Sequence, residues 1–151
     1  IGSPFGDDRV GLLLINALQQ AEQLHPYLGV ELELLAVDRP GAGLLSLFEG
    51  AENAIIIDAV VSGAGLGQLH RWSDSVAIEN GDSFLSSHGF GLAQALTLGR
   101  QLGLLPAQLL VLGIEIDPVV TSADLSPLLE QQLPVLTDLI IEEILPLLKQ
   151  P

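Results

Sequence analysis

The stretch NAIIIDAVV at residues 53–61 is a continuous run of apolar, mostly β-branched residues that contains one aspartate. Runs of this kind are typical of strands that are buried on both faces, as in a parallel sheet covered by helices. A second run, QLLVLGIEI at residues 108–116, has the same character and predicts another buried strand. We therefore expect both segments to lie in the centre of a sheet.

Helical and strand-like segments alternate around these two runs, which predicts an α/β fold. The predicted helices cover residues 10–24, 41–51, 90–103 and 126–150, and the further predicted strands cover residues 30–37 and, nearer an edge, 67–73. The last helix has Ser126 as a natural N-cap and Pro127 at its first position, and Pro134 should kink it. We expect a three-layer sandwich, with a mostly parallel twisted sheet and helices on both faces.

The chain is expected to form a single domain over residues 1–151. Its opening turn, GSPFG, is of a kind that usually follows a strand, and the sequence contains no methionine. We therefore expect the first strand of the sheet to be clipped or reduced to Ile1.

The composition excludes several classes of partner and chemistry. The formal net charge is −14, and five Lys and Arg residues are too few to form a basic face for nucleic acid or an anionic membrane. There are no cysteines, which excludes disulfides and thiolate chemistry and fits a reducing cytoplasm. No apolar run approaches the roughly 18 residues of a transmembrane span, and no signal peptide is visible.

Three polar residues should meet at one edge of the predicted sheet. Asp58 ends the run AIII, Asp8 lies in the turn before the first helix, and His88 lies in the loop before the helix at residue 90. Strand-to-helix loops share one edge of such a sheet because the crossovers are right-handed. Two carboxylates and one imidazole suit zinc, nickel, manganese or iron and leave coordination positions open for substrate or water.

Each of these residues also has a plain structural interpretation. Asp8, or Asp7 beside it, could simply cap the first helix, and Asp58 could cap a turn. His88 could be a surface histidine. His25 and His70 are more simply explained as structural or solvated residues.

Two glycine-rich stretches, GSPFG and SGAGLG, could cradle phosphate, but the second precedes a strand-like segment and lacks the lysine of a P-loop. No GxSxG or HExxH motif is present.

Taken in order, the motifs GSPFGDDRVG, IIIDAVVSG and SSHGFGLAQAL resemble those of the hydrogenase maturation proteases. These endopeptidases trim the C-terminus of the large subunit of nickel–iron hydrogenases. The short first motif with Ser3 looks most like the branch that serves NAD-linked bidirectional hydrogenases. Ser3 stands where the family usually has Asn, the turn is one residue shorter, and Arg9 replaces the Gly after the acidic pair. The resemblance covers essentially the whole chain.

The resemblance implies a site and a substrate. The ligand roles of the family fall on Asp8, Asp58 and His88, which would recognise nickel already present in the precursor. Zinc or another divalent ion could substitute for it. The metal could fix the substrate, polarise the scissile carbonyl or activate water, or the carboxylates could do the acid–base work with nickel as a checkpoint. Asp7 would cap the helix or orient Asp8, and Asp38 is a weak candidate for lining the substrate groove.

The resemblance further implies a cytoplasmic monomer whose partner is the precursor of the hydrogenase large subunit. Two alternatives remain open from the sequence. The protein could be a non-catalytic maturation chaperone that binds the nickel-loaded precursor through the same site. It could also be an α/β domain without a metal.

Overall fold

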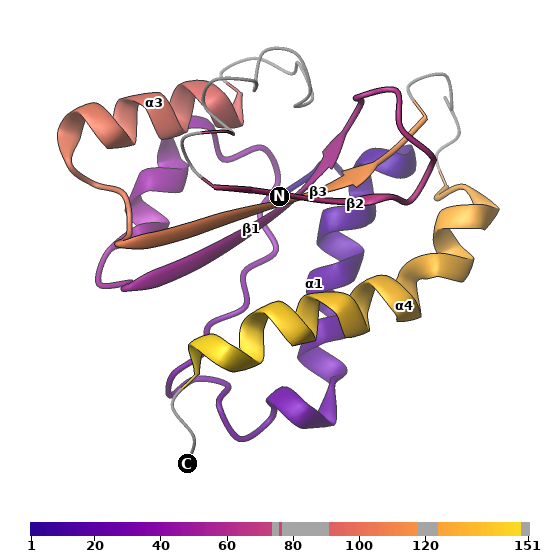
Figure 1. Cartoon of the computed structure of the whole chain (residues 1–151), viewed down its shortest axis with the longest axis horizontal. Coiled ribbons are helices and arrows are strands. Elements are labelled where there is room, and N and C mark those ends of the chain that lie inside the picture. Colours follow the sequence, from indigo (N-terminus) through magenta and orange to yellow (C-terminus); the bar gives the residue numbers. More distant parts are fainter. Residues whose placement is uncertain (74–75, 77–90, 118–123, 149–151) are drawn as a thin grey trace.

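A computed structural model describes residues 1–73, 76, 91–117 and 124–148 (Figure 1). Its α-helices are α1 (Val10–Gln20), α3 (Leu92–Leu102) and α4 (Pro127–Ile144), and its strands are β1 (Asn53–Val60), β2 (Leu69–Ser73) and β3 (Gln108–Glu115). The 3-10 helices within these residues are η1 (Gly6–Arg9), η2 (Glu22–Leu24), η3 (Gly41–Phe48) and η4 (Leu145–Leu147). No helix in this part of the chain has the length and apolar character needed to cross a membrane.

The three strands form one sheet in the order β1-β3-β2. The two apolar runs found in the sequence pair in parallel along their whole length, from Asn53 opposite Gln108 to Val60 opposite Glu115. The more polar β2 pairs with β3 in the antiparallel direction and forms an edge of the sheet, as its composition predicted. The sheet is therefore mixed, with its two most apolar strands in parallel.

Helices cover both faces of this sheet, which confirms the predicted α/β architecture (Figure 1). Alternate residues of a strand point to opposite faces, so β1 and β3 contribute to two separate cores. Leu14 of α1 and Ile140 of α4 pack with Ile57 on one face. Leu96 of α3 and Phe48 of η3 pack with Ile56 on the other.

The strand predicted at residues 30–37 is not formed. Among the described residues, Leu32 forms an isolated bridge with Leu28, and Asp38, which directly follows the segment, forms one with Gly2. The alternating pattern of apolar residues is present, but a strand is defined by a hydrogen-bonded neighbour, and no strand of the described residues lies beside this one.

Two predicted helices also differ from the structure. The segment predicted as a helix at residues 41–51 is the 3-10 helix η3, which ends at Phe48. It begins with Gly-Ala-Gly, and glycine disfavours a regular α-helix. The last helix continues through Pro134, and a further 3-10 turn, which contains Pro146, follows Ile144.

Gly11 allows α1 to lie directly against the sheet. A Cβ atom at this position would overlap the carbonyl oxygen of Ile1 and would lie 3.0 Å from the carbonyl oxygen of Ile57 in β1. Both obstacles are backbone atoms, so no side-chain rotation relieves the overlap.

We predict that Gly11→Ala lowers the free energy of unfolding by about 1–3 kcal/mol, the usual cost of overpacking a close contact. Urea unfolding of the purified variant measures this change. Gly43→Ala is the matched control, because a Cβ atom at Gly43 has open space around it. Equal stability of the two variants would contradict the assigned packing of α1.

Candidate functional site

Asp58 lies buried near the carboxyl end of β1. Only 4% of the residue is exposed, and its Oδ1 accepts a hydrogen bond from the backbone N–H of Ala59 at 2.9 Å. Burial raises the pKa of Asp58 to about 6; the positive amino group of Ile1 opposes this shift, and the negative charge of Asp8 adds to it. Asp58 is therefore half-ionised near pH 6, about two pH units above the point at which an ordinary aspartate is half-ionised.

The opening turn of the chain positions Asp8. Gly6 adopts a left-handed conformation with φ of 55°, and the N–H of Ser3 donates to the carbonyl oxygen of Asp8 at 3.2 Å. A Cβ atom on Gly2 would overlap that same carbonyl oxygen, so the turn requires glycine there. Within the described residues, the buried Oδ1 of Asp8 has no hydrogen-bond partner. The turn thus delivers an unsatisfied carboxylate oxygen close enough to Asp58 to affect its pKa.

Asp7 ties this turn to the last helix instead of capping the first one. Its Oδ1 accepts a hydrogen bond of 2.6 Å from the backbone N–H of Ser126, the residue before α4. The side chain is 3% exposed, and its Oδ2 has no partner among the described residues. Asp7 therefore anchors η1 to the start of α4, and this anchor holds the neighbouring Asp8 in place.

Asp38 is close to the same edge but is open to solvent. Its bridge to Gly2 places it beside the opening turn. Its carboxylate accepts hydrogen bonds from Arg39 Nε at 2.7 Å and Nη2 at 3.3 Å, and these bonds lower the pKa of Asp38. Arg39 has a positive φ of 39°, which is unusual for a residue with a side chain.

His88, the third predicted ligand, lies outside the described residues. Within the described ranges, no three His, Asp or Glu side chains are grouped so that they could hold a metal ion. The structure thus brings Asp8 and Asp58 into electrostatic contact, with Asp7 and Asp38 beside them. Two adjacent carboxylates can accept protons from water or supply oxygen ligands to a divalent cation.

Sequence reasoning missed a second buried acid, Glu115, at the carboxyl end of β3. Glu115 is 1% exposed, and its Oε1 accepts hydrogen bonds from the N–H groups of Ser62, Gly63 and Ala64 at 2.7, 2.9 and 3.2 Å. Its Oε2 accepts a bond from Ser62 Oγ at 2.7 Å and lies 3.0 Å from His70 Nε2. The signal was in the sequence, because Glu115 follows an apolar run just as Asp58 does.

These hydrogen bonds shift the pKa of Glu115 in the direction opposite to that of Asp58. Burial alone raises the pKa of Glu115, but its hydrogen bonds with Ser62, Gly63 and His70 outweigh burial and lower it. Glu115 thereby holds the loop that follows β1 against the end of β3. His70, which also stacks on Trp72 with ring centroids 5.1 Å apart, has the structural role expected from the sequence.

We predict that Asp58→Asn stabilises the protein, and more so as pH rises. The folded pKa of about 6 exceeds the reference value of 3.8, so ionising Asp58 opposes folding above pH 3.8, and the cost stops growing above about pH 6. The stability difference between variant and wild type should increase by about 1–2 kcal/mol between about pH 5 and about pH 7.5. Urea unfolding at both pH values tests this, and a pH-independent difference would contradict it.

Glu115→Gln should have the opposite effect. The lowered pKa of Glu115 means that its ionised form stabilises the fold at neutral pH, and this contribution fades as pH falls through the folded pKa. Glutamine places an N–H₂ group, itself a donor, beside the N–H and O–H donors that face Glu115. We therefore expect the free energy of unfolding to fall by about 2–3 kcal/mol at neutral pH. Glu143→Gln, which removes a half-exposed ion pair with Arg71, should change stability by less than about 1 kcal/mol. Equal losses in the two variants would contradict the role of Glu115.

Solved structures with the same fold are hydrogenase maturation enzymes. The hydrogenase maturating endopeptidase HybD from Escherichia coli matches with a TM-score of 0.79 at 23% identity, over 95% of this chain and 87% of that chain. The [NiFe] hydrogenase maturation protease HybD from Thermococcus kodakarensis matches with a TM-score of 0.71 at 22% identity, over 93% of each chain. At this level of identity, the two likenesses establish the fold.

The family is established by the sequence itself. No curated protein sequence matches the chain. The sequence model of one family, HycI, described as hydrogenase maturation protease, matches residues 14–143. Because this match covers most of the chain, the protein belongs to the hydrogenase maturation protease family.

Proposed function

We propose that this protein is the endopeptidase that removes the C-terminal extension of a nickel-loaded hydrogenase large-subunit precursor. Asp8, Asp58 and His88 recognise the nickel, which the precursor brings with it. The observation that carries the proposal is the pair formed by buried Asp58, with its raised pKa, and Asp8, whose buried Oδ1 has no hydrogen-bond partner in the described part of the chain. Among the described residues, the carboxylate of Asp58 accepts one hydrogen bond, from the N–H of Ala59, and the Oδ1 of Asp8 accepts none.

The donor chemistry of the pair fits a divalent cation. A cation bound between Asp8 and Asp58 would offset their mutual repulsion and the desolvation of Asp58. Carboxylate oxygens together with an imidazole suit nickel, and zinc could replace it in the same donor set. When bound, the metal supplies charge that orients the precursor at the site.

Peptide-bond cleavage requires a group that accepts a proton from water. Water adds to the scissile carbonyl carbon, the C–N bond then breaks, and the proton passes to the leaving amine. Asp58 is suited to this role because a base works best when its pKa lies near the working pH, and its own is about 6. Burial keeps the pKa of Asp58 raised, and the charge of Asp8 adds to this effect. Asp38, which lies open to solvent beside the turn, is positioned to contact the precursor tail.

The proposal extends to the cellular setting. We place the protein in the cytoplasm, because the absence of cysteine suits a reducing compartment. We also propose that it acts as a monomer. Its strongly acidic character disfavours contact with nucleic acid or anionic membranes.

Cleavage of a purified, nickel-loaded precursor tests the proposal. We expect Asp58→Asn to slow cleavage by at least about 100-fold, the usual contribution of a general base, while the fold is retained. Asparagine keeps the Oδ1 atom that accepts from Ala59, so the local hydrogen bond persists. The control is Asp138→Asn, on the exposed surface of α4, which should cleave at the wild-type rate.

Binding of the same precursor, measured alongside cleavage, distinguishes the alternatives. A wild-type protein that binds the nickel-loaded precursor without trimming it would be a maturation chaperone. Undiminished cleavage by Asp58→Asn would reject the assignment of Asp58 as the base.

A further inference from the structure

Arg39 has a backbone conformation that a residue with a side chain rarely adopts. Its φ is +39°, and among the described residues no other residue with a side chain has a positive φ. Pro40 follows it, and a residue that precedes proline favours extended conformations with negative φ. Glycine would take this conformation without strain, but the chain has arginine here.

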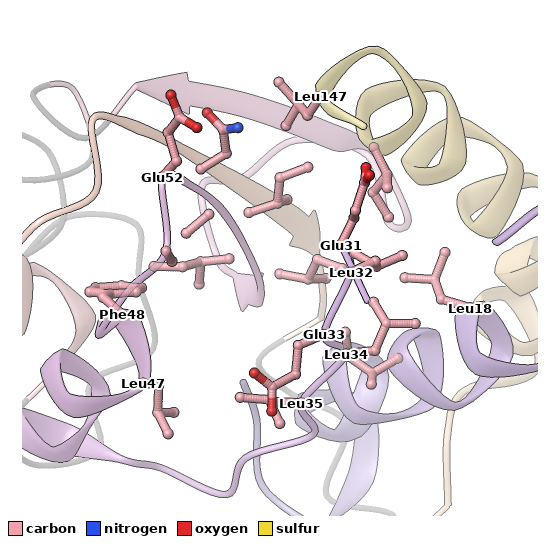
Figure 2. Close-up of a pocket in the computed structure, with 18 of the residues that line it drawn as sticks. Leu18, Glu31, Leu32, Glu33, Leu34, Leu35, Leu47, Phe48, Glu52 and Leu147 are labelled. Carbon is pink, nitrogen blue, oxygen red and sulfur yellow. The ribbon is translucent and has the colours of Figure 1, made fainter. Parts of the chain in front are cut away.

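The backbone of Arg39 is held by the opening turn of the chain. Its N–H donates to the carbonyl oxygen of Gly2 at 3.2 Å, and Asp38 forms a parallel bridge with Gly2. Among the described residues, no backbone hydrogen bond joins the preceding segment, residues 33–37, to β1, and both line a cavity of about 770 Å³ (Figure 2). The bonds to Gly2 therefore fix Arg39 beside the turn that carries Asp8.

The side chain of Arg39 contributes little stability that would offset this strain. Its Nε and Nη2 donate to Asp38 at 2.7 and 3.3 Å, but the two side chains remain 51% and 48% exposed. Exposed ion pairs contribute little, because water solvates both charges and two long side chains must be ordered. A strained residue whose contacts do not explain its stability cost is typical of a functional site.

Arg39 brings positive charge to a region that is mostly acidic. The hydrogen bond and the charge of Asp38 raise the pKa of Arg39, and the charge of Asp8 adds to this effect. The whole chain has five Lys and Arg residues and a formal net charge of −14. Arg9, at the end of η1, also lies in this region, but its φ is an ordinary −79°. Of these two arginines, Arg39 is the one held in place by a strained backbone.

We propose that Arg39 is a substrate-binding residue, which donates hydrogen bonds to backbone carbonyl oxygens of the precursor tail. A guanidinium has five N–H groups, and Asp38 takes two of its nitrogens as donors, so further donors remain for a ligand. Peptide carbonyl oxygens are partly negative, so the carboxylates of Asp8, Asp38 and Asp58 repel them and a guanidinium attracts them. This inference rests on the proposed function, because it takes the precursor as the ligand.

Arg39→Gly and Arg39→Lys test the inference with the purified, nickel-loaded precursor. Glycine removes the guanidinium and suits a positive φ. Lysine keeps the charge but lacks the planar fork of donors. The control is Arg100→Gln, which removes a positive charge from the last turn of α3, before the start of β3 and away from its carboxyl end. The affinity for the precursor, KM, kcat and the thermal unfolding midpoint are measured for each protein.

We expect Arg39→Gly to weaken precursor binding and to raise KM by about 10- to 100-fold, the usual effect of losing a hydrogen bond from a charged group. A residue that only holds the substrate changes kcat much less than KM. The unfolding midpoint of Arg39→Gly should equal or exceed that of the wild type, because the strain is relieved and the exposed ion pair contributes little. Arg39→Lys should give an intermediate KM, and Arg100→Gln should match the wild type.

A wild-type KM and affinity in Arg39→Gly would overturn the inference, while continued cleavage would leave the proposed function intact. Weaker binding together with a lower unfolding midpoint would also overturn it, because Arg39 would then have a structural role. A wild-type protein that does not cleave the precursor would reject the proposed function, and the affinities of the same variants would then decide the role of Arg39 alone. If Arg39→Gly does not fold, Arg39→Gln replaces it in the same comparison.

Discussion

The parallel ladder between β1 and β3 brings two buried carboxyl groups, Asp58 and Glu115, to the same edge of the sheet. The pKa of Asp58 is raised and that of Glu115 is lowered, and the candidate site depends on this difference. The alternation of each strand also places both side chains on the face covered by α3 and η3. The two groups are almost equally buried. Burial by itself raises the pKa of a carboxyl group, and hydrogen bonds donated to the ionised form lower it, as they do for Glu115.

Glu115 is surrounded by donors and Asp58 is not. Three backbone N–H groups and a serine hydroxyl donate to Glu115, whereas Asp58 accepts one hydrogen bond from the described part of the chain, that of the Ala59 N–H. Glu115 is therefore held ionised as part of the framework. Asp58 bears a cost of burial that the amino group of Ile1 offsets only in part, and the charge of Asp8 adds to that cost. A buried carboxyl group maintained in this way points to function, because binding a proton or a cation relieves the cost of its buried charge.

The sequence was most informative where burial alone decides the structure. The runs at 53–61 and 108–116 predicted β1 and β3 because a strand buried on both faces leaves few polar positions. The prediction of a strand at residues 30–37 was wrong, because an alternating pattern specifies two faces but does not specify a hydrogen-bonded neighbour. Glu115 was missed although it ends an apolar run as Asp58 does, because its partners at Ser62 and His70 come from distant parts of the sequence. Of the predicted site, Asp8 and Asp58 lie near each other, whereas His88 falls outside the described residues.

The first residues of the chain connect β1 to the candidate site. The amino group of Ile1 donates to the carbonyl oxygen of Ile57 in β1, and the carbonyl oxygen of Gly2 accepts the N–H of Arg39. The next residue, Ser3, donates to the carbonyl oxygen of Asp8, so the turn that carries Asp8 follows directly on residues that are bonded to β1 and to Arg39. Precise placement of a reacting pair depends on rigid neighbouring elements, so the bonds of Ile1 and Gly2 help to set the position of Asp8 relative to Asp58.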